Sequence, residues 1–309
     1  MIVKKEMNNN IDFVGDIHGH ADALVKLLEG MDYKKQNGVY KHASRKLFFV
    51  GDYIDRGPKI RETLQIVKGM CDAGEAFAIM GNHEYNAICF HTNGLDGKPL
   101  REHSEKNIAQ HIKTLEEFKY AQNEWQEYLE WFKTLPLYFE NDHFRVVHAC
   151  WDKEHIHELI QFERNNMEDN NFLINSSTKE TTEYKIVDEI LKGKEVYLEG
   201  ESFTDKDGHL REDGRIKWWK SSNNLKARDF IFEYPGLGKN FDIKSQNDRY
   251  PLDDKPVFFG HYWLKGNYPE LMANNVCCLD YSVAEHGILC AYRWNGETAL
   301  SADAFVWVG

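Results

Sequence analysis

The sequence predicts an α/β fold whose sheet is built from repeated strand–loop–helix units. Short apolar runs at residues 11–14, 46–50 and 76–80 each end abruptly in a glycine followed by a polar residue. Segments with apolar residues at helical spacing follow the first two runs. This repetition over the first eighty residues is typical of a parallel sheet with crossover helices. Ligands of such sheets bind beyond the carboxyl ends of the strands, so the residues that follow the runs are candidate site residues.

The expected elements follow the chain in order. The first helix covers residues 21–29 and ends at Gly30, and the second follows Pro58 and ends near Gly74. The chain then favours a loop at 91–102, one long helix at 106–133, and a hairpin of residues 137–140 and 144–148. Polar loops are expected at 165–171 and 205–214, and a helix at 183–191. A further strand at 257–259 precedes antiparallel strands at 276–279, 287–294 and 298 onward.

Composition limits the classes of function. The 309 residues carry a formal net charge of −12, which disfavours bulk binding to nucleic acid or to an anionic membrane. The polar start, Met1 to Asn10, does not resemble a secretory signal, and there is no apolar run long enough to span a bilayer. The six cysteines form no CxxC pair. We therefore expect a cytoplasmic protein with reduced thiols.

Five strand ends deliver side chains that bind metals. They are Asp16 with His18, Asp52 with Asp55, Asn82 with His83, His148, and His261. Each residue alone has an ordinary structural interpretation: a Gly-Asp turn, a helix cap at Asn82, or a buried core histidine at His148. Repetition at five separate strand ends favours a metal site instead.

The types of these residues indicate the metals and the chemistry. Asp16 and His18 lie two residues apart, so in an extended segment they face the same way. Oxygen and imidazole ligands without thiolate suit Mn, with Fe, Zn, Co or Ni as alternatives. A carboxylate such as Asp52 can bridge two ions, which is the usual arrangement for hydrolysis of phosphate esters.

The motifs around these residues resemble those of the calcineurin-like metallophosphoesterases. They are Gly15-Asp16-Ile17-His18-Gly19, Gly51-Asp52-Tyr53-Ile54-Asp55-Arg56-Gly57, Gly81-Asn82-His83-Glu84, Val147-His148-Ala149 and Gly260-His261. The Asp-Arg-Gly and Gly-Asn-His-Glu forms resemble the phosphoprotein phosphatase branch. The tail, from Gly260-His261-Tyr262-Trp263 through Leu279-Asp280 to Tyr292-Arg293-Trp294, is similar to that of symmetrical dinucleoside tetraphosphatases.

The resemblance implies a fold of two packed mixed β-sheets flanked by helices, a four-layer sandwich. It also implies two divalent metal ions. The first ion would be held by Asp16, His18 and Asp52. The second would be held by Asp52, Asn82, His148 and His261. We expect one domain over residues 1–309, with an insert at about 152–255 beside the substrate.

The resemblance further assigns the catalytic roles. A metal-bridging hydroxide would attack phosphorus, His83 would protonate the leaving oxygen, Asp55 would orient His83, and Arg56 would bind phosphate oxygens. Physical chemistry agrees, because histidine exchanges protons near neutral pH and arginine offers a planar fork to two oxygens. An alternative for Asp55 and Arg56 is a surface ion pair at the start of a helix.

A second arginine for the phosphate has no secure counterpart in the chain. Arg215 is the candidate, and its alternative is a solvated residue beside the neighbouring Trp218 and Trp219. The aromatic residues of the insert either stack on a base or pack against the core. They are Phe203, Trp218, Trp219, Phe230, Phe232 and Tyr234.

Three functions remain open at this point. The first is a phosphomonoesterase of the serine/threonine phosphatase type, and the second is a symmetrical bis(5'-nucleosyl)-tetraphosphatase. The third is a binding module without catalysis, which the presence of every ligand and of the acid His83 disfavours. The expected partner is a phosphorylated small molecule, a nucleotide or a phosphopeptide, and the sequence does not determine the oligomeric state.

Overall fold

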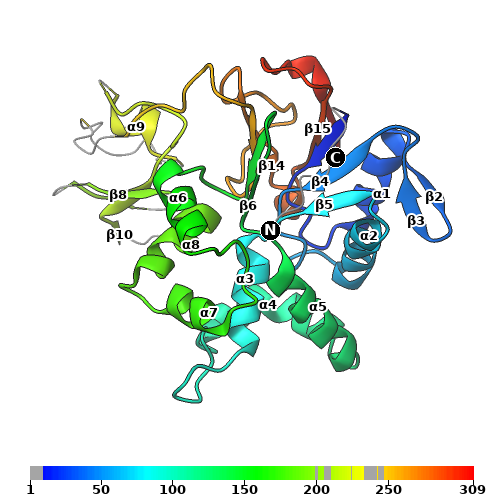
Figure 1. Ribbon diagram of the computed structural model, residues 1–309, viewed down its shortest axis with the longest axis horizontal. Coiled ribbons are helices and arrows are strands. Elements are labelled where there is room, and N and C mark those ends of the chain that lie inside the picture. Colours follow the sequence, from blue (N-terminus) through cyan, green and yellow to red (C-terminus); the bar gives the residue numbers. More distant parts are fainter. Residues whose placement is uncertain (1–9, 199–200, 205–209, 224, 233–241, 243–246) are drawn as a thin grey trace.

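The computed structural model describes residues 10–198, 201–204, 210–223, 225–232, 242 and 247–309. Two β-sheets form its centre and helices cover them (Figure 1). The structure therefore confirms the predicted mixed α/β class. Of the polar loop predicted at 205–214, residues 205–209 lie outside the described residues, as does Tyr234. The prediction was wrong for the rest of that loop, because residues 210–211 and 213–215 form short antiparallel strands.

The first sheet has six strands and contains the three predicted parallel strands. Its order is β14 (Asp280–Tyr281), β15 (Ile288–Trp294), β1 (Ile11–Val14), β4 (Lys46–Phe49) and β5 (Ala76–Ala78), with β16 (Phe305–Val308) also paired to β15. Strands β1, β4 and β5 run parallel, while β15 is antiparallel to β1. The carboxyl ends of β1, β4 and β5 therefore meet at one edge.

The second sheet has four strands and carries the later ligands. Its order is β13 (Val276–Cys278), β12 (Val257–Phe259), β7 (Arg145–Val147) and β6 (Tyr138–Glu140). The hairpin of β6 and β7 is antiparallel, as predicted. The prediction that residues 276–279 join the antiparallel tail was wrong, because β13 pairs parallel to β12. The long segment 260–275 carries the chain back across the sheet, which a parallel pair requires.

The two sheets pack face to face over an aromatic core. Phe13 of β1 stacks on Phe258 of β12 with ring centroids 3.7 Å apart. Phe144 meets Phe13 edge to face at 5.1 Å, and Trp294 meets Phe144 in the same way at 5.1 Å. All four side chains are almost fully buried. This contact fixes the strand ends of one sheet relative to those of the other.

Helices α1 (Ala21–Gly30) and α2 (Ile60–Asp72) lie beside the first sheet, next to the small hairpin of β2 (Lys34–Gln36) and β3 (Val39–Lys41) (Figure 1). The apolar positions Ile60, Leu64 and Val67 of α2 are buried, as their spacing predicts. Helix α3 (Asn82–His91) follows β5 and begins at a predicted ligand.

The long helix predicted at 106–133 is two helices, α4 (Glu105–Glu117) and α5 (Gln122–Thr134). The chain turns at residues 118–121, where Phe118 is buried against Trp125 with ring centroids 5.0 Å apart. A straight helix would separate these two residues by about two turns, roughly 10 Å. The break allows both rings to enter the same core.

The described part of residues 152–255, the predicted insert, contains four helices and four short strands. Its helices are α6 (Lys153–Gln161), α7 (Asn170–Ser177), α8 (Thr182–Lys192) and α9 (Ala227–Phe230). Its short strands are β8 (Glu195–Tyr197), β9 (Phe203–Thr204), β10 (Leu210–Arg211) and β11 (Asp213–Arg215). The predicted loop at 165–171 is shorter than expected, because Asp169 caps α7.

The aromatic residues of the insert mostly serve packing. Trp218, Trp219 and Phe230 are buried. Both tryptophans contact Phe259 of β12, and the indole N–H of Trp218 donates to the carbonyl of Ala149 at 2.8 Å. The core interpretation therefore holds for these three side chains.

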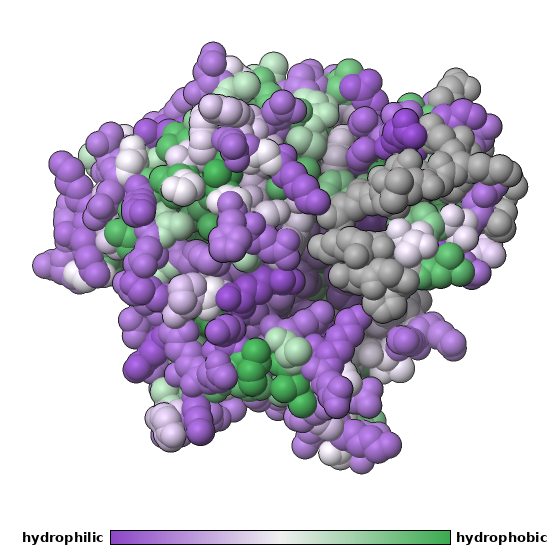
Figure 2. Space-filling view, turned by 180° about the vertical axis from the view of Figure 1, so that it is seen from behind, coloured by the Kyte–Doolittle hydropathy of each residue, from purple (hydrophilic) through white to green (hydrophobic). Residues whose placement is uncertain are grey.

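No described helix has both the length and the apolar character needed to cross a membrane. Figure 2 shows that the rear face is largely hydrophilic, with hydrophobic residues in separate small groups.

Candidate active site

The loops after the strands of both sheets bring the predicted ligands together. His18 follows β1, Asp52 follows β4, and Asn82 begins α3 after β5. His148 follows β7 and His261 follows β12 of the other sheet. Ligand atoms of His18, Asp52 and His83 lie within 4.8 Å of one another, and so do those of Asp52, His148 and His261. Asp52 belongs to both groups, as the prediction of a bridging carboxylate requires.

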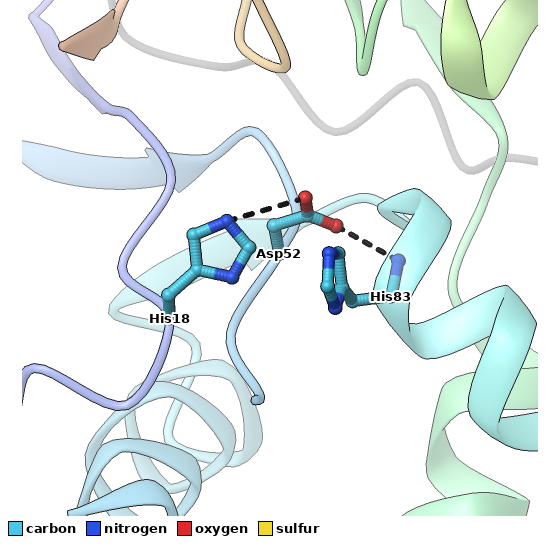
Figure 3. A group of neighbouring side chains, drawn as sticks. All are labelled: His18, Asp52 and His83. Atoms are coloured by element: carbon cyan, nitrogen blue, oxygen red, sulfur yellow. Dashed lines mark hydrogen bonds and ion pairs between the residues drawn. The ribbon is translucent and has the colours of Figure 1, made fainter. Parts of the chain in front are cut away.

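The first group is shown in Figure 3, with His18 and His83 on either side of Asp52. The Nε2 atom of His18 lies 3.6 Å from Oδ2 of Asp52. The main-chain N–H of His83 donates to the other oxygen, Oδ1, at 2.9 Å. Asp16, predicted as a ligand of the first ion, is not a member of this group, and its Oδ2 accepts the main-chain N–H of His261 at 2.9 Å.

The second group gathers around Asn82. Its Oδ1 lies 3.0 Å from Nε2 of His148 and 2.7 Å from Nδ1 of His261. His148 Nε2 is also 3.4 Å from Oδ2 of Asp52. The four side chains predicted to hold the second ion therefore face a common point.

The tautomers of two histidines turn lone pairs toward Asp52. His18 donates from Nδ1 to the carbonyl of Ile54 at 3.0 Å, and His148 donates from Nδ1 to the carbonyl of Val50 at 2.8 Å. In a neutral ring the Nε2 atom then carries a lone pair, which faces an anionic oxygen. A bound cation would stabilise this arrangement, and the carbonyl contacts fix the orientation of both rings.

Buried atoms without partners mark the same place. Asp16 Oδ1, His18 Nε2 and His261 Nε2 are buried and find no hydrogen-bond partner among the described residues. Such atoms are rare in proteins, and a bound ion is one of their ordinary explanations. The residues present therefore fit the two divalent ions expected from the sequence.

The electrostatics of the site favour cations. Burial lowers the pKa of His18 to about 3, so this ring is neutral near pH 7. Burial, Asp280 and Asp52 together raise the pKa of Asp16 well above its ordinary value. Burial lowers the pKa of His148, but the charge of Asp52 outweighs this effect and raises it. A proton and a cation therefore compete for the space between His148 and Asp52.

The ligand loops approach one another closely. A Cβ atom on Gly260 would lie 1.9 Å from Oδ1 of Asp16, so only glycine fits there. Three of the side chains lie on residues in the left-handed backbone region: His18, Asp52 and His261 have φ of 46°, 54° and 70°. Such strain persists where the surrounding structure holds the chain in place.

Glu84 supplies much of that support. Its carboxylate accepts the main-chain N–H groups of Asp52 at 2.9 Å, Tyr53 at 2.8 Å and Gly81 at 3.0 Å. Burial and the charge of Asp52 raise the pKa of Glu84 to about 7. Glu84 belongs to the predicted Gly-Asn-His-Glu motif, but the motif alone did not reveal this role.

His83 and Asp55 form the predicted pair. The Nδ1 atom of His83 lies 2.5 Å from Oδ2 of Asp55. Burial lowers the pKa of His83, but the charges of Asp52 and Asp55 outweigh it and raise the pKa. Burial raises the pKa of Asp55, but hydrogen bonds from His111 and His83 outweigh it and hold the pKa below its ordinary value. Asp55 is thus a buried carboxylate, and the surface ion pair with Arg56 is not its environment.

The two predicted phosphate-binding arginines lie in different surroundings. Arg56 is exposed and its guanidinium lies over the ring of Trp263, 4.1 Å from the centroid. Arg215 is half-buried in β11, and its Nε atom has no hydrogen-bond partner among the described residues. After burial, the charge of Arg215 is the largest cause that lowers the pKa of His261. Arg215 is therefore near enough to His261 to act on it electrostatically, and its half-buried side chain is not simply solvated.

A third group of possible ligands, Asp152, His155 and Glu189, lies in the insert. Asp152 caps α6 and accepts a hydrogen bond from the ammonium group of Lys194 at 2.9 Å. His155 lies between Glu158 at 3.1 Å and Glu189 at 3.0 Å. Internal partners thus satisfy this group, and we assign no metal to it.

The matches between this chain and curated proteins cover a little under half of its residues. Over 140 residues it is 29% identical to an asymmetrical bis(5'-nucleosyl)-tetraphosphatase PrpE of Oceanobacillus iheyensis, covering 45% of this chain and 54% of the relative. Over 139 residues it is 31% identical to a symmetrical bis(5'-nucleosyl)-tetraphosphatase of Actinobacillus succinogenes, covering 44% and 42%. The chain thus spans about half the length of the curated relatives it matches.

The fold extends further than the sequence similarity. A serine/threonine protein phosphatase from Saccharomyces cerevisiae, described as similar to human phosphatase PP5, superposes with a TM-score of 0.52. The two are 12% identical, and the match covers 99% of this chain and 80% of the other. This likeness concerns the fold alone and agrees with the predicted pair of packed sheets.

A family profile described as calcineurin-like phosphoesterase matches residues 10–276, which include every predicted metal ligand. Members of this family use a dinuclear centre of divalent metals. The class of enzyme predicted from the sequence, a metal-dependent phosphoester hydrolase, is the class that this family contains. The chain belongs to the calcineurin-like phosphoesterase family.

Proposed function

We propose that the chain is a hydrolase with two divalent metals that cleaves a phosphoanhydride bond of bis(5'-nucleosyl) tetraphosphates. The observation that carries the proposal is the position of Asp52, whose Oδ2 lies 3.6 Å from Nε2 of His18 and 3.4 Å from Nε2 of His148. Two bound divalent ions, with Mn as the preferred metal, would acidify water and offset charge on the phosphate oxygens.

The proposed ligands divide between two ions. The first ion takes Asp16, His18 and Asp52. The second ion takes Asp52, Asn82, His148 and His261. The unpartnered buried atoms of Asp16, His18 and His261 support this division. Both sheets contribute ligands, so binding also stabilises their contact.

The other residues act on the phosphate and on the leaving group. Water supplies the oxygen that bonds to phosphorus while the bond from phosphorus to the leaving oxygen breaks. Because Nδ1 of His83 faces Asp55, its Nε2 atom is the one that would deliver a proton to the leaving oxygen. Arg56 and Arg215 would bind the phosphate oxygens from two directions.

The substrate class rests on the relatives. The two tetraphosphatases described above are each about 30% identical to the matched half of this chain. They support a dinucleoside polyphosphate over a phosphoprotein, which was the first interpretation of the sequence. A cytoplasmic location is part of the proposal, and the six unpaired cysteines support it.

Phosphomonoester hydrolysis is the second candidate, and the pair of His83 and Asp55 favours it. An alkoxide leaves with difficulty unless it is protonated, whereas a nucleoside diphosphate leaves readily. A proton donor held at 2.5 Å from a buried carboxylate therefore suits esters of serine or threonine.

Parallel assays of the Mn-loaded protein test both candidates. The panel is diadenosine tetraphosphate, para-nitrophenyl phosphate and a phosphoserine peptide, with Asp52→Asn as the inactive control. A kcat/KM at least about 100-fold higher for the dinucleotide than for either monoester supports the proposal. This ratio corresponds to a difference of roughly 2.7 kcal/mol in activation free energy. Two ADP molecules would indicate symmetrical cleavage, and ATP with AMP would indicate asymmetrical cleavage. Preference for the monoesters would overturn the substrate assignment but keep the hydrolase.

A further inference from the structure

The carboxylate of Asp55 is held at both oxygens. Its Oδ2 faces Nδ1 of His83 at 2.5 Å. Its Oδ1 accepts a hydrogen bond from Nδ1 of His111 at 2.8 Å and another from the hydroxyl of Thr114 at 2.6 Å. Because a carboxylate only accepts hydrogen bonds, both histidines present Nδ1–H to it.

One face of α4 carries this support. His111, Thr114 and Glu117 lie three residues apart along the helix, so their side chains share a face. Thr114 Oγ1 also accepts the main-chain N–H of Asp55, at 3.2 Å. Glu117 accepts the N–H groups of Ile60 and Arg61, both at 2.8 Å, and so caps the start of α2. Helix α4 therefore holds the whole loop from Asp55 to α2.

That loop needs the support. Asp55 and Arg56 have φ of 68° and 60°, in the left-handed region that side chains disfavour. Each such residue costs of order 1 kcal/mol or more unless its surroundings hold it. Asp55 fixes the ring of His83, and Arg56 is the proposed phosphate ligand. A loose loop would therefore misplace both groups.

The surroundings of His111 indicate that its contact with Asp55 is specific. The ring is buried among Phe90, His91 and Trp125, with centroids 5.4–5.8 Å away. Its Nε2 atom finds no partner among the described residues. The polar contact of the ring is thus the one from Nδ1 to Asp55, and apolar packing alone would not select this orientation.

We propose that His111, together with Thr114, is a positioning residue that fixes Asp55 and, through it, the proton-donating ring of His83. This inference rests on the proposed role of His83 as the proton donor. It assigns a function to α4, which lies outside the motifs that carry the family resemblance. The effect of losing His111 should appear in proton delivery to the leaving group, not in metal binding.

The test compares two substitutions of His111. His111→Asn keeps a donor near the position of Nδ1, and His111→Leu removes it. The substrates are para-nitrophenyl phosphate, whose leaving group needs little protonation, and phenyl phosphate, whose leaving group needs more. We expect His111→Leu to lower kcat for phenyl phosphate about 10-fold more than for the nitrophenyl ester, with KM and bound metal unchanged. His111→Asn should restore most of the difference.

Matched controls separate positioning from packing. His91→Leu removes a ring of the same aromatic cluster, which contacts His111 and accepts a hydrogen bond from Trp125, and it should slow both substrates equally. If His111→Leu fails to fold, Thr114→Val and Thr114→Ser are compared on the same two substrates. Thr114→Val removes the hydroxyl that donates to Oδ1 of Asp55, and Thr114→Ser keeps it.

Each outcome decides between the two proposals. Equal slowing of both substrates by His111→Leu, or no rescue by His111→Asn, overturns the positioning role. His83→Asn serves as the reference for proton donation. If His83→Asn shows no preference between the substrates, the proposed role of His83 fails. If it does show one and His111→Leu and Thr114→Val do not, only the inference about α4 fails.

Discussion

The main-chain N–H of His261 donates to Oδ2 of Asp16 across 2.9 Å, although the two residues are 245 positions apart in the chain. Asp16 follows the first strand of the six-stranded sheet, and His261 follows a strand of the four-stranded sheet. This hydrogen bond joins the proposed ligand loops of both sheets. The site therefore exists only when the two sheets are packed together.

The shared position of Asp52 predicts the effect of removing its charge. Asp52→Asn should lower hydrolysis of every substrate on the order of 1,000-fold, because both proposed ions lose a carboxylate ligand. Metal analysis of the purified protein should find fewer ions per chain than the two expected in the wild type. Chelation of the wild type should lower its Tm, and the same treatment should change the variant less. Two ions retained by Asp52→Asn would contradict the bridging role.

Gly260 predicts a steric effect on the same site. A Cβ atom at this position would lie 1.9 Å from Oδ1 of Asp16. Gly260→Ala should therefore displace Asp16 or His261 and weaken metal binding, measured by calorimetric titration with Mn. The matched control is Gly69→Ala in α2, where a Cβ meets no atom within 4 Å. That change should be neutral or stabilise the fold by about 0.5–1 kcal/mol. Equal metal affinities in both variants would count against the close approach.

Arg215 predicts a loss of phosphate binding without loss of metal. Arg215→Gln should lower kcat/KM for all phosphate substrates about 10- to 100-fold, because a charge beside His261 that is proposed to bind the phosphate is gone. Metal content should stay at the wild-type value. Lys226→Gln, which removes an exposed ion pair with Asp242, should leave kcat/KM unchanged. Wild-type kinetics in Arg215→Gln would show that the residue is structural.

A buried ion pair predicts a stability effect far from the chemistry. Arg45 donates to Oδ1 of Asp12 at 2.7 Å, and also to the carbonyl oxygens of Ile11 and Trp294. Arg45→Met should lower the free energy of unfolding by about 3–5 kcal/mol, because the buried Asp12 carboxylate loses its main partner. Urea denaturation measures this change. Lys68→Ala, which removes a surface pair with Asp72, should cost less than about 0.5 kcal/mol. Similar losses in both variants would contradict the buried network.

His155 predicts a pH dependence of stability. Burial lowers its pKa, but hydrogen bonds to Glu189 and Glu158 outweigh this effect and raise the pKa above 6.5. Asp152, itself paired with Lys194, is the other charged group nearby. The folded protein therefore binds the proton of His155 more tightly than the unfolded chain does. The contribution of protonated His155 to the free energy of unfolding is complete below pH 6.5 and declines as the pH rises through the raised pKa.

The measurement compares the wild type with His155→Gln. The difference in unfolding free energy should be largest near pH 6 and should shrink above neutral pH. A difference that grows with pH would contradict the direction of this shift.

Local patterns in the sequence predicted most of the elements near the site. The structure confirms the predicted strands at 11–14 and 46–50 and the helix after Pro58. Those predictions used the spacing of apolar residues and the glycines that end each segment. The prediction of one helix over 106–133 was wrong, because the structure has two helices there. The helical spacing of apolar residues continues through residues 118–121 and so does not mark the turn. The turn there depends on packing between Phe118 and Trp125, which the period of the pattern does not encode.

Pairing and long-range contacts were harder to predict. Residues 276–278 have the composition of a strand, but composition does not state whether the strand pairs parallel or antiparallel. His111 lies in a helix without a motif, so only its 2.8 Å contact with Asp55 indicated a role. The same holds for Glu84, whose three main-chain contacts become visible only in the folded chain.

The sequence by itself determined the family, the fold class and which residue types stand at the five strand ends. Those features depend on local order along the chain, where an apolar run, a glycine and a polar residue stand side by side. The tertiary structure decided how those ends meet, how α4 supports Asp55, and that Arg215 lies near enough to His261 to act on it electrostatically. These relationships join residues tens to hundreds of positions apart, and only the packing of two sheets and their helices fixes such distances.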